Sequence, residues 1–212
     1  MSSRCKEYLV DESENIHINI KEEEYDFTKW RDVAPEHLAY MESGWQFYYK
    51  LIKFGGIMLH SSAVVLNGEV YLFSGPSGMG KSTHTRMWTS LFPGAKIIND
   101  DKPALRKIDG VWYAYGTPWC GKDGINLNVK APVKGICFLR QGDSNKMRRL
   151  SPIEAVGAIF SQTQSRVASD YALGKVTSII EQLISDVPVY ELVNNAKEEA
   201  ALLSHKIMST EE

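Results

Sequence analysis

Polar and apolar positions divide this chain into an N-terminal region and a longer region of short apolar segments. Residues 1–34 are polar and acidic, and residues 16–20 within them alternate apolar and polar side chains, which predicts a half-exposed strand. Residues 35–54 instead carry apolar side chains at helical spacing, which predicts a helix with one broad apolar face. The side chains of that face are Leu38, Met41, Trp45, Tyr48, Tyr49 and Ile52. We interpret residues 1–54 as a strand and helix appendage that packs on a core domain formed by residues 55–212.

The second region begins with a predicted hairpin. Residues 57–66 and 69–74 are apolar segments of strand length, and Asn67-Gly68 between them is a strong signal for a two-residue turn. Residues 82–91 contain no glycine or proline, which predicts a helix that ends near Pro93-Gly94.

The remaining chain alternates strand and helix signals. Asp109-Gly110 predicts a second hairpin, and the four residues from Ser151 to Glu154 have the pattern of a capping box with proline at the first helical position. The further elements that we expect are strands over 96–99, 103–108, 111–115, 133–139 and 187–192, and helices over 152–162, 169–184 and 196–208. This order predicts an α/β fold with a mixed sheet and C-terminal helices.

A glycine-rich stretch separates the strand 69–74 from the helix 82–91. It matches the pattern G-x-x-x-x-G-K-[ST] of a P-loop, with the fixed positions at Gly75, Gly80, Lys81 and Ser82. Glycines let the backbone curl so that successive N–H groups point at a phosphate, and the helix N-terminus adds its dipole. Lys81 would reach the β- and γ-phosphates, and the Ser82 hydroxyl would hold Mg²⁺. The expected nucleotide-binding residues are Gly75, Pro76, Ser77, Gly78, Met79, Gly80, Lys81, Ser82 and Thr83.

Two adjacent carboxylates, Asp100 and Asp101, follow the predicted strand 96–99. A carboxylate at the end of the strand after the P-loop helix suits Mg²⁺, bound directly or through water. With two carboxylates, one can hold the metal while the other accepts a proton from an attacking hydroxyl. Asp-Asp before Lys-Pro is also ordinary turn chemistry, and by position we favour the functional interpretation.

Two further residues are weaker candidates. His60 lies on the predicted strand that precedes and pairs with the P-loop strand, so its side chain would end near the phosphates; a buried structural histidine is the alternative. Lys122 lies in a loop with three glycines, and it could neutralise charge in a transition state. A solvated surface lysine is the alternative there.

Composition and charge narrow the class of protein. At 212 residues and 43% apolar, the chain can form one domain with a sizeable core, and its net charge of −2 gives no nucleic-acid footprint. The widely spaced Cys5, Cys120 and Cys137 have no metal-ligand spacing and favour a reducing compartment. No signal peptide is visible, and no apolar run approaches the ~18 residues of a membrane span. We expect a cytoplasmic protein without nucleic-acid or membrane partners.

The order of these motifs resembles the catalytic domain of the HPr kinase/phosphorylase family. That family has a histidine on the strand before the P-loop and an Asp-Asp pair at a similar distance after it. The nucleotide core is also similar to that of ATP-dependent phosphoenolpyruvate carboxykinases. Small HPr-kinase-like proteins carry motifs similar to GPSGMGKST, NDDKP and GTPWCGK of this chain, and some phosphorylate a serine of a peptide. The resemblance covers roughly residues 57–140.

This resemblance implies a phosphotransferase with ATP and Mg²⁺ as cofactors and an alcohol group as acceptor. Asp100 would be the general base, Asp101 would support metal or proton transfer, and His60 would lie near the γ-phosphate. The acceptor would be a serine of a peptide or protein, or a small metabolite, and the protein could form a homo-oligomer. The alternatives are a nucleotide-binding sensor with little catalysis and carboxykinase-like decarboxylation.

Overall fold

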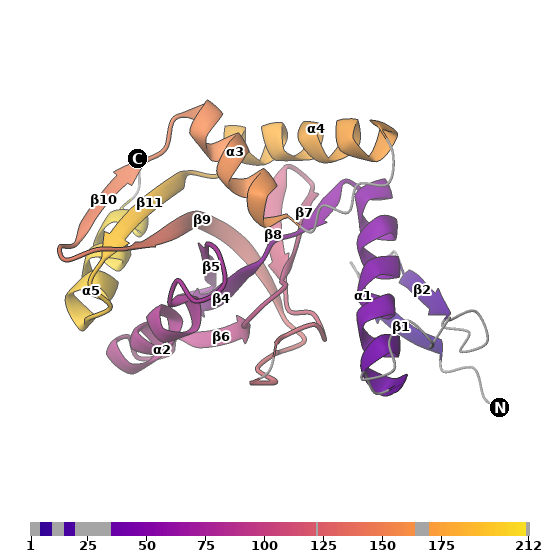
Figure 1. Cartoon of the computed structure of the whole chain (residues 1–212), viewed down its shortest axis with the longest axis horizontal. Helices are drawn as coiled ribbons and strands as arrows, with labels where there is room; N and C mark the ends of the chain where they lie inside the picture. The colour runs from indigo at the N-terminus through magenta and orange to yellow at the C-terminus, as the bar shows by residue number, and fades with distance from the viewer. Residues whose placement is uncertain (1–4, 10–14, 20–34, 122, 164–169, 211–212) are drawn as a thin grey trace. The chain divides into compact units, whose positions relative to one another are not determined.

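The chain divides into two compact units, Met1–Phe54 and Gly55–Glu212. The computed structural model (Figure 1) describes residues 5–9, 15–19, 35–121, 123–163 and 170–210. The first unit contains the strands β1 (Cys5–Leu9) and β2 (Asn15–Asn19), which pair antiparallel, and the helix α1 (Pro35–Lys53). The strand and the helix predicted there are therefore present, and β1 is an element that the sequence pattern did not indicate.

The second unit is a mixed α/β structure built on one curled sheet. In the described residues the strands follow the order β3-β7-β8-β9-β5-β4-β6, with β11 on β9 and β10 on β11. The strands are β3 (Gly56–Met58), β4 (Ser61–Leu66), β5 (Glu69–Ser74), β6 (Lys96–Asn99), β7 (Ala104–Ile108), β8 (Val111–Tyr115), β9 (Lys130–Gln141), β10 (Lys146–Arg149) and β11 (Val189–Asn194). The helices are α2 (Lys81–Leu91), α3 (Pro152–Gln162), α4 (Asp170–Asp186) and α5 (Glu198–Met208).

The long strand β9 holds this sheet together. Its first residues pair antiparallel with β8, and the following ones pair parallel with both β5 and β11. Figure 1 shows β9 arching across the unit. Since β5, β9 and β11 run in the same direction, their carboxyl ends meet at one edge of the sheet, where the glycine loop that follows β5 also lies.

The segment 57–66 is not one strand, as the sequence pattern predicted, but two. β3 pairs with β7, whereas β4 pairs with β5 and β6. The strand breaks at Leu59 and His60 because the two halves need different neighbours. There the Leu59 amide donates to the Pro103 carbonyl at 3.2 Å, and the His60 amide donates to the Gln162 carbonyl at 2.9 Å. His60 therefore lies on the break rather than within a regular strand.

Both predicted hairpins are confirmed. Asn67 and Gly68 have φ of 53° and 82°, and they join β4 to β5 in antiparallel register. Asp109 and Gly110 have φ of 49° and 87°, and they join β7 to β8. Left-handed backbone at both central residues is what a tight hairpin requires, and Asn-Gly and Asp-Gly supply it at low cost.

The C-terminal elements agree with the prediction in type and differ in their ends. The capping box at Ser151 is formed, with Glu154 accepting from the Ser151 amide and hydroxyl. β9 extends beyond the predicted 133–139 at both ends, and β10 was not predicted because its sequence is almost entirely polar. Ser169, the predicted start of α4, lies outside the described residues.

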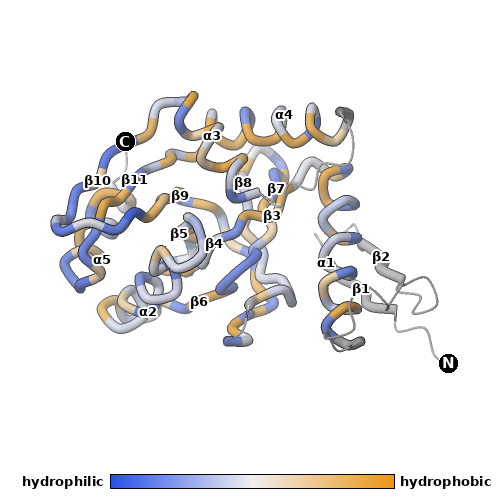
Figure 2. The backbone as a smooth tube through the Cα atoms, in the orientation of Figure 1, coloured by the Kyte–Doolittle hydropathy of each residue, from blue (hydrophilic) through white to orange (hydrophobic). Residues whose placement is uncertain are grey.

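The helices cover the sheet on two sides. α2 packs against β4, β5 and β6 and beside α5, whereas α3 and α4 pack on each other. In Figure 1 the pair α3 and α4 lies above the sheet and the pair α2 and α5 lies below it. Hydrophobic and polar stretches alternate along α4 (Figure 2), as an amphipathic helix requires. Within the described residues, no helix has the length and apolar character that crossing a bilayer would need.

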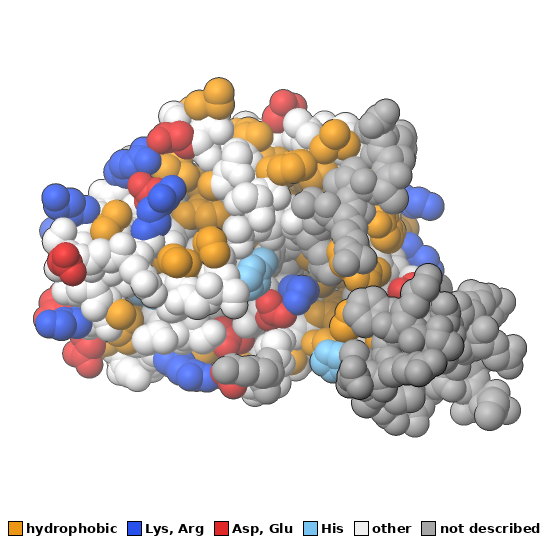
Figure 3. Space-filling model, in the orientation of Figure 1, with side chains coloured by type: hydrophobic (Ala, Val, Ile, Leu, Met, Phe, Trp, Pro, Cys, Tyr) orange, Lys and Arg blue, Asp and Glu red, His pale blue; other side chains and the backbone are white. Residues whose placement is uncertain are grey.

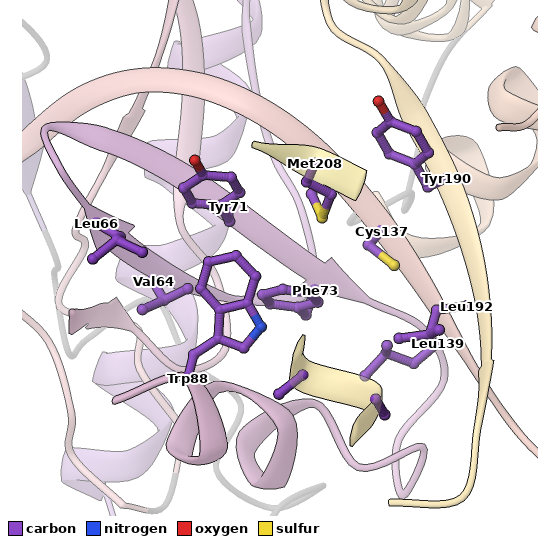
Figure 4. Packing of buried hydrophobic residues seen from close by; sticks show 12 residues of the cluster. Val64, Leu66, Tyr71, Phe73, Trp88, Cys137, Leu139, Tyr190, Leu192 and Met208 are labelled. Atoms are coloured by element: carbon purple, nitrogen blue, oxygen red, sulfur yellow. The ribbon is translucent and has the colours of Figure 1, made fainter. Parts of the chain in front are cut away.

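One hydrophobic cluster fixes the position of α2. Trp88 of α2 is fully buried, with its ring centroid 4.7 Å from that of Tyr71 and 5.3 Å from that of Phe73, both on β5 (Figure 4). The ring of Trp88 also lies edge-on to that of His205 in α5. Further members of the cluster are Val64, Leu66, Cys137, Leu139, Tyr190, Leu192, Ala200, Ala201 and Met208. Burial of these side chains holds the start of α2 at the end of β5.

A buried polar contact accompanies this packing. The Ser204 hydroxyl donates to the Ala201 carbonyl at 3.0 Å, so it can only accept from Trp88 Nε1 at 3.0 Å and from His84 Nε2 at 2.9 Å. His84 Nε2 therefore carries the ring proton. His84 Nδ1 is buried and has no hydrogen-bond partner in the part of the chain that the structure describes, and burial lowers the pKa of His84 from 6.5 to about 4.

The lowered pKa predicts an acid-sensitive fold. Because His84 binds a proton more weakly in the folded state, its contribution to stability is complete above pH 6.5 and is lost as the pH falls towards 4. The loss should reach about 3 kcal/mol of unfolding free energy. His84→Gln keeps an N–H donor for Ser204 but cannot become charged. Urea titrations across this pH range should show a steeper fall for the wild type than for the variant; parallel falls would contradict the assignment.

Candidate active site

The glycine loop, defined here as Gly75–Gly80, connects β5 to α2. Gly75, Gly78 and Gly80 have φ of 141°, 83° and 89°, values that side-chain-bearing residues rarely adopt. A Cβ atom on Gly75 would also lie 3.2 Å from the Leu139 carbonyl oxygen. Gly80 is the N-cap of α2, and the exposed Pro76, Ser77 and Gly78 place the turn of the loop in solvent. The loop thus surrounds the N-terminus of a helix, an arrangement suited to an anion.

Lys81, the first residue of α2, lies beneath this loop. Its Nζ donates to the carbonyls of Gly75 at 2.8 Å and Pro76 at 3.1 Å, and the residue is 9% exposed. Burial lowers the pKa of Lys81, and the charges of Asp101 and Asp100 act in the opposite direction. The ammonium group is therefore held between the loop and the two aspartates. Ser82 is half-buried and Thr83 is exposed in the same first turn.

The turn of Asp100 and Asp101 is organised by the preceding residue, Asn99. This fully buried side chain accepts hydrogen bonds at Oδ1 from the amides of Asp101 at 2.9 Å and Lys102 at 2.7 Å. Its Nδ2 donates to the Thr117 carbonyl at 2.8 Å and hydroxyl at 3.2 Å. Sequence reasoning did not single out Asn99. The signal was an asparagine at a strand end, where such a side chain commonly bonds the backbone two residues on.

His60 and Asp101 come together across the sheet. His60 Nε2 lies 3.5 Å from Asp101 Oδ1, and Lys102 Nζ lies 2.5 Å from Asp101 Oδ2. Burial lowers the pKa of His60, the charge of Lys81 adds to this effect, and Asp101 opposes it. These contacts place His60, Lys81 and Asp101 in one electrostatic environment, with Asp100 close enough to influence Lys81.

Asp100 differs from Asp101 in its surroundings. Asp100 Oδ1 is buried and has no hydrogen-bond partner among the described residues, whereas both oxygens of Asp101 face other charged or titratable side chains. A buried carboxylate oxygen without a donor is a suitable ligand for a cation. No cluster of three or more acidic, histidine or cysteine side chains that could bind a metal ion occurs among the residues described.

The loop before β9 closes against the aspartates. A Cβ atom on Gly121 would lie 3.3 Å from Asp101 Cβ, and Asp123 accepts a hydrogen bond from Arg86 of α2 at 2.6 Å. Lys122, the candidate cation between them, lies outside the described residues, so its proposed role stays a prediction.

Two cavities lie near the candidate site residues, and the larger one borders the glycine loop. The smaller one, of about 270 Å³, is lined by Met58, His60, Asp101, Lys102, Ser161, Gln162 and Thr163. The larger one, of about 480 Å³, lies between the loop and α3, and its lining includes Gly75, Pro76, Met79, Phe138, Leu150, Ile153 and Gly157. Ser161 and Gln162 line both cavities, so the two spaces meet at the C-terminal end of α3.

An ion-pair network borders the larger cavity. Arg148 pairs with Glu154 at 3.0 Å and with Glu191 at 3.1 Å, and Glu191 also pairs with Arg140. The Arg148 contacts hold the pKa of Glu154 at about 2. Hydrophobic, basic and acidic side chains accordingly lie together over α3 and β10 in Figure 3. The cavity combines an apolar surface with fixed charges.

Known proteins match this chain in structure but not in sequence. No family model matches the chain, and no curated protein matches it. A similar solved structure is that of the Hpr(Ser) kinase/phosphatase from Coxiella burnetii, with 12% sequence identity and a TM-score of 0.42. The similarity covers 71% of this chain and 87% of that chain.

The contacts of Asn99 predict that it is essential for the geometry of the aspartate turn. Asn99→Ala leaves two backbone amides and the Thr117 carbonyl without a partner, and it should lower the unfolding free energy by about 2–4 kcal/mol. Asn128→Ala, at an exposed position of the loop before β9, is the matched control and should change it by less than about 0.5 kcal/mol. Urea unfolding measures both, and equal stabilities of the two variants would contradict this role.

Proposed function

We propose that this protein is a kinase that uses ATP and Mg²⁺ to phosphorylate a hydroxyl group. The observation that carries the proposal is the convergence of the glycine loop, Lys81, the Asp100-Asp101 turn and His60 on one edge of the sheet. Phosphoryl transfer depends mainly on positioning and on charge stabilisation, which such a set of groups can supply.

The glycine loop would hold the phosphates. Its backbone and the N-terminus of α2 offer N–H donors, and Lys81 provides a cation directly below. A triphosphate oxygen can replace the carbonyls of Gly75 and Pro76 as acceptor for the Lys81 ammonium group, since charge-assisted bonds to an anion are stronger.

Mg²⁺ fits the donor set, since hydroxyl and carboxylate oxygens are its preferred protein ligands. Ser82 and one or both aspartates would hold it. The best-placed oxygen is Oδ1 of Asp100, which has no hydrogen-bond partner among the described residues. When bound, the ion neutralises charge on the phosphates and on the leaving group.

The aspartates would also accept the proton of the acceptor. As the acceptor oxygen forms its bond to the γ-phosphorus, the bond from that phosphorus to the bridging oxygen breaks and ADP leaves. The acceptor proton passes to a carboxylate of the Asp100-Asp101 pair. Asp101 lines the smaller cavity beside His60, so this cavity is the proposed entry of the hydroxyl.

The larger cavity is the proposed site of the nucleoside. Its volume of about 480 Å³ lies within the range of ligand pockets, and its lining includes Gly75, Pro76 and Met79 of the glycine loop. Leu150 and Ile153 offer apolar contact for a base, and Arg148 offers a planar guanidinium.

Phosphoryl transfer should depend on Lys81 and on each aspartate. With γ-labelled ATP and extract fractionated into small molecules, peptides and proteins, the wild type should label one fraction. Lys81→Ala and Asp100→Asn should each reduce labelling by at least about 100-fold, because the charge stabilisation of the transferred group is lost. Lys96→Ala, at an exposed position on β6, is the matched control and should label like the wild type.

The same assay separates the two carboxylates. Asp101→Asn is assayed beside Asp100→Asn. Excess Mg²⁺ should partly restore labelling by the variant that has lost a metal ligand, and it should not restore labelling by the variant that has lost the proton acceptor. The kinase proposal is wrong if the protein binds ATP but transfers label to no fraction. It is also wrong if the aspartate variants label as much product as the wild type.

Filling the larger cavity should weaken nucleotide binding. Gly157 lines this cavity in α3, and a Cβ atom there meets nothing within 4 Å, so Gly157→Phe can enter the space without a backbone clash. We expect the dissociation constant for ATP to rise about tenfold, or 1.4 kcal/mol. Gly174→Phe in α4 is an equally open helical position away from the cavity and should leave it unchanged. Calorimetric titration with ATP measures the dissociation constant of each variant. Equal constants for the two variants would show that the nucleoside does not bind in the larger cavity.

A further inference from the structure

Gln162 forms two hydrogen bonds with His60, one to its backbone and one to its ring. The His60 amide donates to the Gln162 carbonyl at 2.9 Å, and His60 Nδ1 lies 3.1 Å from Gln162 Oε1. Gln162 is the last residue of α3, 102 positions along the chain from His60. Neither the sequence motifs nor the proposed mechanism assigns it a role.

The surrounding contacts determine which way the Gln162 amide points. Its Nε2 donates to the Ser161 carbonyl at 3.1 Å and lies 3.4 Å from the Ser161 hydroxyl. That hydroxyl donates to the Ala158 carbonyl at 2.8 Å, so it can only accept from the amide. A flipped amide would place its oxygen against a carbonyl oxygen. The oxygen of the amide must therefore face His60.

This orientation fixes the proton on the imidazole. An amide oxygen only accepts, so His60 Nδ1 must carry the hydrogen of the neutral ring, and Nε2 then carries a lone pair. Burial and the nearby Lys81 lower the pKa of His60, whereas Asp101 and the Gln162 hydrogen bond act in the opposite direction. Nε2 points towards Asp101 Oδ1, 3.5 Å away, and both residues line the smaller cavity.

The backbone keeps this contact in place. Thr163, the residue after α3, forms a bridge with Leu59, the residue before His60. The other end of α3 is held by its capping box. The His60–Gln162 main-chain bond and the adjacent Leu59–Thr163 bridge thus join the end of α3 to the strand break.

We propose that Gln162 is a positioning residue, which locks His60 in the Nδ1–H tautomer and turns the Nε2 lone pair towards the smaller cavity. The Nε2 and Oδ1 atoms then form a pair of acceptors for a single donor, such as the hydroxyl of an alcohol. This catalytic consequence rests on the proposed kinase function, whereas the tautomer itself does not.

The tautomer is tested by ¹⁵N NMR of the imidazole nitrogens in the full chain, at about pH 8 so that the ring is neutral. His60→Asn identifies the His60 signals. In the wild type, we expect Nδ1 of His60 to be the protonated nitrogen. Gln162→Leu removes the acceptor and should move the proton to Nε2, whereas Gln162→Glu keeps an acceptor oxygen and should retain the Nδ1–H form. Gln182→Leu, at an exposed position in α4, should leave the signals unchanged.

The proposal is overturned if the wild-type ring is protonated at Nε2, or if Gln162→Leu leaves the tautomer unchanged. The first of these results is measured on the wild type and does not depend on whether a variant folds. In the transfer assay, Gln162→Leu should lower kcat about tenfold, as is typical for partners that orient a reacting side chain. An Nδ1–H ring in a wild type that transfers no phosphate would support the positioning role and contradict the kinase function.

Discussion

Three consecutive backbone amides at the break between β3 and β4 hold the candidate site together. The amides of Leu59, His60 and Ser61 donate to the carbonyls of Pro103, Gln162 and Asp101, respectively. The His60 carbonyl in turn accepts from the Ser74 hydroxyl at the end of β5, at 2.8 Å. One short irregular segment therefore connects the aspartate turn, the end of α3 and the start of the glycine loop. In a regular strand these three amides would pair with the neighbouring strands of the sheet. The break frees them to bond the aspartate turn and the end of α3, so these segments converge because the strand is irregular.

Local signals in the sequence were sufficient for most elements. The hairpins at Asn67-Gly68 and Asp109-Gly110 and the capping box at Ser151 are each specified by a few adjacent residues, and each was predicted correctly. The strand break at His60, by contrast, follows from the choice of sheet partners. No local pattern encodes that choice, because the partners are distant in the chain.

The candidate site shows the same division. The glycine loop and the aspartate pair were identified from residue type and spacing, and their catalytic roles remain predictions. Gln162 acts through hydrogen bonds to His60, 102 residues away, so neither spacing nor composition could reveal it, whereas Asn99 offered the local signal of an asparagine at a strand end. The electrostatic balance is similar: Lys81 and Lys102 compensate for Asp100 and Asp101, which becomes visible only when the fold brings the four side chains together.

The parallel pairing of β5 with β9 has a consequence for synthesis of the chain. Leu72 pairs with Ile136, and β9 in turn pairs with β11, where Ile136 lies opposite Val189. During translation the glycine loop leaves the ribosome long before β9, the strand that pairs with β5, has been synthesised. Pairings at such sequence separation form slowly, since a long loop must close before any contact is gained. The emerging chain therefore exposes β5 and its apolar side chains until β9 and then β11 arrive, a period in which aggregation competes with folding.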